Sequence, residues 1–121
     1  MTVITILPAD EAFYREKGIA DPAVRAMVIA GGETIEEYIL FVMGDKEMEL
    51  TEMHTADFVL QEGLVRAALN YGFRRELETA FCTQPQMDEI LKFLVFKDTG
   101  ERKEVSLGEF FSRGCKHCIK K

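Results

Sequence analysis

The chain has 121 residues, of which 47% are hydrophobic, and its formal net charge is -6. This length fits a single domain with one core, and the negative charge disfavours nucleic acid as a partner because a phosphate backbone is repelled. The first residues resemble no export signal and no apolar run is long enough to span a bilayer, so we expect a cytoplasmic protein without a membrane partner.

The first half of the chain predicts a strand, a short helix and three further strands. The β-rich run Val3 to Leu7 ends at Pro8, and a helical pattern from Asp10 to Lys17 closes at Gly18. Turn residues separate the next three apolar runs, which favours antiparallel pairing between neighbours. These runs are Val24 to Ala30, Glu36 to Met43 and Glu47 to His54.

The second half predicts two helices and a closing hairpin. An apolar stripe indicates a long helix from Phe58 to Leu77, followed by a short strand from Thr79 to Cys82. Thr83 and Gln86 have the spacing of a capping box before a second apolar helix. The hairpin runs are Val95 to Lys97 and Glu104 to Leu107, after which Ser106 and Glu109 have the spacing to cap a final short turn.

This order of elements resembles the GNAT superfamily of acetyl-CoA-dependent N-acetyltransferases. The segment Gln61 to Cys82 is similar to that family's cofactor helix and the strand after it, and Met87 to Phe96 is similar to its next helix and closing strand. The resemblance implies an α/β (α+β) fold in one domain over residues 1–112, with a mixed, mainly antiparallel sheet of about six strands flanked by helices.

The resemblance also implies an activity, the transfer of an acyl group from acetyl-CoA or another acyl-CoA to the amine of a small molecule or a protein. A homodimer is compatible with it. In the family, backbone N–H groups at the start of the cofactor helix hold the pyrophosphate of coenzyme A. The resemblance assigns the donor contacts here to Gln61, Glu62, Gly63, Leu64, Met53 and Cys82.

Two features of the sequence support other interpretations of this site. The long helix could begin at Phe58 with Asp57 as its N-cap, which would place a carboxylate where the family binds phosphate. The family's tyrosine general acid, counted back from Phe96, falls on Leu91. A second hypothesis is therefore a non-catalytic GNAT-fold module that binds a ligand or a protein. Cys82 itself is more typical of core packing than of a binding site.

Glu52 and His54 are the predicted catalytic residues. Simple alternation puts them on one face of their strand together with Met48 and Leu50, and puts Met53 on the other face. At the end of a strand that would border the cleft, they could act as general base toward an amine, directly or through water. The alternative is that the two residues are simply the solvated end of a strand and have no catalytic role.

The last residues, 113–121, are predicted as a basic, loop-like tail that contains two cysteines. Cys115, His117 and Cys118 form a C-x-H-C cluster whose spacing suits a soft metal or a redox dithiol. Zinc normally takes four ligands and the tail supplies three, so zinc is disfavoured relative to a labile dithiol or a simple flexible tail.

Overall fold

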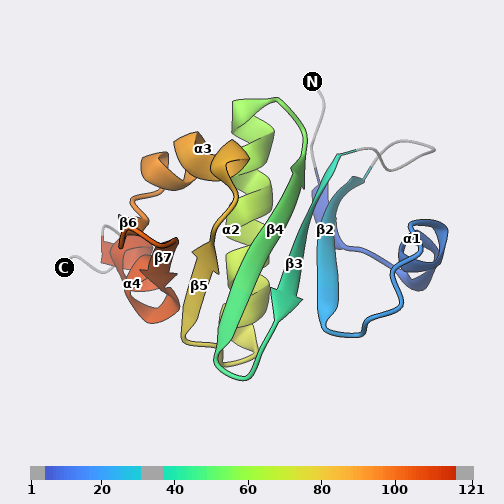
Figure 1. Cartoon of the computed structure of the whole chain (residues 1–121), viewed down its shortest axis with the longest axis horizontal. Helices are drawn as coiled ribbons and strands as arrows, with labels where there is room; N and C mark the ends of the chain where they lie inside the picture. Colours follow the sequence, from blue (N-terminus) through green and yellow to red (C-terminus); the bar gives the residue numbers. More distant parts are fainter. Residues whose placement is uncertain (1–4, 31–36, 117–121) are drawn as a thin grey trace.

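The structure is a computed structural model that describes residues 5–30 and 37–116 (Figure 1). Over these residues, seven strands form one sheet in the order β1-β2-β3-β4-β5-β7-β6, against about six expected. The elements are β1 (Thr5–Pro8), α1 (Glu11–Glu16), β2 (Val24–Ala30), β3 (Tyr38–Met43), β4 (Glu47–His54), α2 (Phe58–Arg74), β5 (Thr79–Cys82), η1 (Pro85–Met87), α3 (Asp88–Phe93), β6 (Lys97–Asp98), β7 (Lys103–Ser106) and α4 (Leu107–Lys116). None of the described helices is both long and apolar enough to cross a membrane.

Neighbouring strands pair antiparallel, except that β4 and β5 run parallel because α2 connects them. Their pairing is short. It begins at Glu47 opposite Thr79 and ends at Glu49 opposite Phe81, while β4 continues to His54. We call the gap between the free part of β4, residues 50–54, and β5 the splay.

The main core lies between the sheet and the helices α2, α3 and α4. Most of the apolar stripe predicted for α2 is confirmed, since Leu64, Val65, Ala68 and Leu69 have no exposed surface. The prediction is wrong for its last member, Phe73, which is 40% exposed near the end of the helix. Each fully buried leucine or valine stabilises the fold by about 1.5–3 kcal/mol. Gly72 completes this face: a Cβ atom there would overlap the Sδ atom of Met48, so the helix approaches β4 closely at this position.

Helix α1 covers only part of the opposite face of the sheet. Asp10 caps this helix by accepting a hydrogen bond from the Phe13 amide at 3.0 Å. Phe13 is buried in a small second core, whose other members are Ala26, Val28, Tyr38 and Leu40 of strands β2 and β3. Because this core stops at β3, the same face of β4 stays accessible, and we call it the open face.

A β-bulge in β4 corrects the predicted alternation. The register shifts between Leu40, which is opposite Glu52, and Phe41, which is opposite Leu50, so Thr51 is an extra residue. The prediction that Met53 faces away from Met48 and Leu50 is therefore wrong, because all three are buried in the main core. The extra residue shifts the phase by one and turns Glu52 and His54 to the open face.

Two local predictions around the last helices are also corrected. The capping box of Thr83 and Gln86 does not form: no side chain caps η1 or α3, and Gln86 Nε2 instead donates to the Met53 carbonyl at 3.1 Å. The predicted Ser106 cap is confirmed, since its hydroxyl accepts from the Glu109 amide at 3.3 Å. The helix that follows continues to Lys116, so the loop-like prediction is wrong up to that residue.

Candidate functional site

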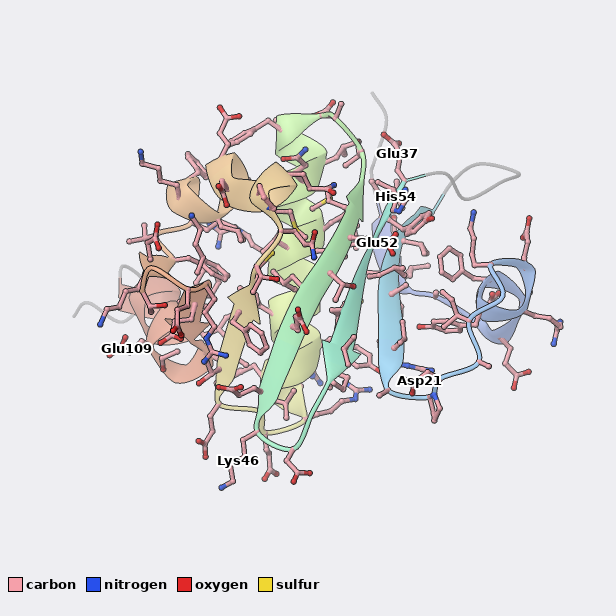
Figure 2. The ribbon with its side chains drawn as sticks, in the orientation of Figure 1. Asp21, Glu37, Lys46, Glu52, His54 and Glu109 are labelled. Carbon is pink, nitrogen blue, oxygen red and sulfur yellow. The ribbon has the colours of Figure 1, made fainter. Side chains whose placement is uncertain are left out.

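Glu52 and His54 lie together at the end of β4, as the sequence predicts. His54 Nε2 is 2.8 Å from Glu52 Oε1, and the two side chains are 55% (Glu52) and 41% (His54) exposed. Figure 2 shows both side chains at one end of the sheet, with Glu37 beside them. A hydrogen bond between groups this exposed adds little to stability.

Tyr38 fixes the imidazole from the neighbouring strand, a role that the sequence did not reveal. It is opposite His54 in the β3–β4 ladder, and the two rings stack with centroids 4.3 Å apart and planes 22° apart. Phe13 packs edge-on against the same tyrosine at 5.0 Å. Burial, and secondarily the charge of Glu52, raises the pKa of the Tyr38 phenol, so its hydroxyl keeps its proton at neutral pH.

The loop from β4 to α2 is held by the hydroxyl and carbonyl of Thr55. Its Oγ1 donates to Glu37 Oε2 at 2.8 Å and accepts from the Asp57 amide at 3.2 Å. Its carbonyl accepts from Gln61 Nε2 at 2.8 Å. The predicted donor contact Gln61 thus uses its side chain to fix this loop, which connects the Glu52–His54 pair to the start of α2.

The start of α2 departs from the phosphate site that the resemblance implies. Asp57 is the N-cap: its carboxylate accepts from the amides of Val59 at 2.9 Å and Leu60 at 3.3 Å. The Gln61 amide donates to the Asp57 carbonyl at 2.9 Å. The helix therefore begins at Phe58, as the alternative interpretation held, and the amides expected to hold phosphate, those of Gln61, Glu62, Gly63 and Leu64, belong to helical hydrogen bonds.

The other predicted donor contacts have structural roles in the protein. The side chain of Met53 is buried, and its carbonyl is occupied by Gln86 across the splay. Cys82 is 2% exposed and its Sγ accepts from the Gln84 amide at 3.3 Å. Burial raises the pKa of the Cys82 thiol, so it behaves as an apolar core residue. Leu91, at the place of the family tyrosine, is fully buried.

Most of the C-x-H-C cluster lies outside the residues that the structure describes. His117 and Cys118 are outside the described residues, and only the backbone of Cys115, in α4, is described. Elsewhere, within residues 5–30 and 37–112, the side chains of His, Cys, Asp and Glu form no group of three or more suited to a metal ion. The dithiol or metal role of the tail stays a prediction.

Two surface cavities lie away from the Glu52–His54 pair. One, of about 340 Å³, lies at the other end of β4 and is lined by Val42, Gly44, Asp45, Lys46, Glu47, Glu49 and Phe81. The other, of about 630 Å³, lies between α3 and the β6–β7 hairpin and is lined by Asp88, Glu89, Lys92, Phe96, Asp98 and Lys103. Neither is lined by Glu52 or His54.

No protein-family profile and no curated protein sequence matches the chain. Solved structures do match. The aminoglycoside 6'-N-acetyltransferase from Enterococcus faecium superposes with a TM-score of 0.64 at 10% identity, over 85% of this chain and 97% of that protein. The ribosomal-protein-S18-alanine N-acetyltransferase from Escherichia coli gives 0.61 at 11% identity, over 86% and 90%. The AtaT-AtaR complex bound to DNA gives 0.61 at 12%, over 82% and 74%. At these identities the likeness concerns the fold.

Proposed function

We propose that this chain, which has the GNAT fold, transfers an acyl group from a thioester donor to an amine. The observation that carries the proposal is the Glu52–His54 pair, 2.8 Å apart on the open face, at the end of the strand that leaves β5. Two of the matching structures are N-acetyltransferases, which supports this reaction class. The acceptor is a small-molecule or protein amine, and the compartment is the cytoplasm.

In the proposed reaction His54 is the general base and Glu52 orients it. When Nε2–H donates to Glu52, Nδ1 is free to accept a proton from the amine, as in other carboxylate–histidine pairs. The neutral amine nitrogen attacks the acyl carbon, so that an N–C bond forms and the C–S bond breaks. The nitrogen loses one proton to His54, and the leaving thiolate takes a proton from solvent. The Tyr38 ring keeps the imidazole in this orientation.

The residues at the start of α2 do not fit the pyrophosphate of coenzyme A. The amides of Val59 and Leu60, which an anion would need, are bonded to the Asp57 carboxylate, and that carboxylate would repel a phosphate. We therefore assign no step of the reaction to the nucleotide part of a donor. The chemistry above needs only a thioester.

Acyl transfer is tested by following thiol release from acetyl thioesters with a panel of primary amines. We expect His54→Gln to lower kcat by about 10²–10⁴-fold, the usual contribution of a general base. Asp45→Asn, which removes an exposed charge at the other end of β4, is the control and should retain activity. If the wild-type protein releases no thiol above the uncatalysed rate with any amine, the proposal is wrong.

A non-catalytic binding module is the second candidate, and one contact and one missing acidic group favour it. Gln86 bridges the splay by donating to the Met53 carbonyl at 3.1 Å, and Leu91 offers no acid to a leaving thiolate. This candidate predicts that a thioester or its thiol raises the melting temperature without being consumed. Thiol release that depends on His54 would contradict it.

A further inference from the structure

We infer that the donor taken by this site is a neutral thioester without a pyrophosphate, of the acyl-pantetheine kind, and that acyl-coenzyme A is disfavoured. The inference rests on the proposed function and names its donor class. It follows from three properties of the start of α2: the occupation of its amides, the charge around it and the apolar surface beside it.

Most of the amides that a helix leaves free in its first turn are already used at the start of α2. A helix exposes four N–H groups in its first turn, and these are what binds an anion. Here the amide of Asp57 donates to Thr55 Oγ1, and the amides of Val59 and Leu60 donate to the Asp57 carboxylate. A phosphate would have to displace the carboxylate of Asp57 from two hydrogen bonds.

The charges nearby oppose an anion as well. The sequence from Glu47 to Val65 contains no lysine or arginine, and it contributes the carboxylates of Asp57 and Glu62 near the helix start. The next cation along α2, Arg66, is held by Glu62 at 3.0 Å. An exposed like charge a few ångströms away weakens binding by about fivefold per unit charge in water. A donor with several phosphate charges therefore loses affinity that a neutral donor keeps.

The surface beside the helix start is apolar. Phe58, the first residue of α2, is 36% exposed and packs edge-on against Phe93 of α3 with ring centroids 5.2 Å apart. Phe93 is 56% exposed, and Val59 is 71% exposed. Figure 1 shows α3 beside the upper end of α2, where the loop from β4 enters. Exposed rings next to a carboxylate suit an uncharged chain better than a polyphosphate.

The free edge of β4 provides polar contacts for such a chain. Residues 50–52 of β4 have no ladder partner in β5, because the pairing of the two strands ends at Glu49. Peptide groups along an unpaired strand edge bind ligands that carry amides of their own. A pantetheine arm has two amides and no charge. Its amides match the unpaired peptide groups of this edge, and its uncharged chain matches the apolar surface beside the start of α2.

The test compares pantetheine, 4'-phosphopantetheine and coenzyme A, which share one arm and differ in charge, by isothermal titration of the full chain. We expect pantetheine to bind at least as tightly as coenzyme A, with phosphopantetheine between them or equal to them. Coenzyme A binding tenfold or more tightly than pantetheine would overturn the inference and leave the proposed function standing. If none of the three binds at millimolar concentration, and no acetyl thioester is consumed, both fall.

A charge-removing variant makes the test specific. Asp57→Asn keeps a good N-cap and removes the carboxylate, so the ratio of coenzyme A to pantetheine affinity should rise about fivefold. The matched control is Asp21→Asn: the Asp21 carboxylate also accepts an amide two residues on, from Ala23 at 2.9 Å, but lies at the opposite end of the sheet from His54 (Figure 2). In Asp21→Asn the ratio of coenzyme A to pantetheine affinity should not change. An unchanged ratio in a folded Asp57→Asn variant would contradict the inference.

Discussion

Replacing Tyr38 by leucine tests whether an aromatic ring holds the imidazole of His54, the proposed general base, in place. The ring makes two aromatic contacts, edge-on with Phe13 at 5.0 Å and stacked on His54 at 4.3 Å. Each is worth about 0.5–1.5 kcal/mol beyond the area that it buries, and leucine keeps part of the apolar volume. We expect the free energy of unfolding, measured in urea at pH 7, to fall by about 1–3 kcal/mol. The rate of thiol release should fall as well, because the imidazole loses its support.

Two comparisons separate this explanation from a general loss of packing. Tyr38→Phe keeps the ring and should remain within about 0.5 kcal/mol of the wild type, with activity retained. A double-mutant cycle with His54→Ala should give a coupling energy of about 0.5–1.5 kcal/mol between the two positions. A coupling near zero, or a phenylalanine variant as damaged as the leucine variant, would refute the role of the stack.

Three further predictions concern single groups. In a Cys115→Ser, Cys118→Ser background, Cys82 should react with a thiol reagent at pH 8 only after denaturation. The reason is that Cys82 is 2% exposed and that burial raises the pKa of its thiol. Fast labelling of the native protein would contradict its place in the core. Asp57→Ala should lower the free energy of unfolding by about 1 kcal/mol and Asp57→Asn by a few tenths, as urea melts would show; equal losses would argue against the cap. Burial raises the pKa of Tyr38 in the folded state above 10.0, so the unfolded chain loses this proton first and the free energy of unfolding should decline as pH rises above 10.0. Tyr38→Phe should show a shallower decline. If the free energy of unfolding falls equally with pH in both proteins, this contribution is excluded.

Much of the fold could be predicted because its signals are local. The strands at Val24–Ala30, Glu47–His54 and Thr79–Cys82 have the predicted bounds, since apolar runs closed by turn residues mark them in the sequence. The stripe of α2 and the Ser106 cap follow from side-chain spacing in the same way. The order of these elements was then sufficient to indicate the fold.

The site was predicted only in part, because its geometry depends on contacts between strands. Glu52 and His54 were identified from their spacing on β4, but the bulge at Thr51 changes which face they occupy. Once that register is known, Tyr38 falls opposite His54; without it, no pattern in the sequence connects them. The spacing of Gln86 predicted a helix cap, but its side-chain amide instead donates to the carbonyl of Met53, 33 positions away in the sequence.

The extra residue in β4 also bears on how this strand would tolerate insertions and deletions. Thr51 stands outside the ladder, and its hydroxyl donates to the Leu40 carbonyl at 3.1 Å. Removing it would restore a regular strand in which Met53 still faces the core and Glu52 and His54 still face solvent. Adding a residue beside it while the one-residue bulge is kept would reverse those faces and bury two ionisable groups. The length of this strand can therefore shrink by one residue more safely than it can grow.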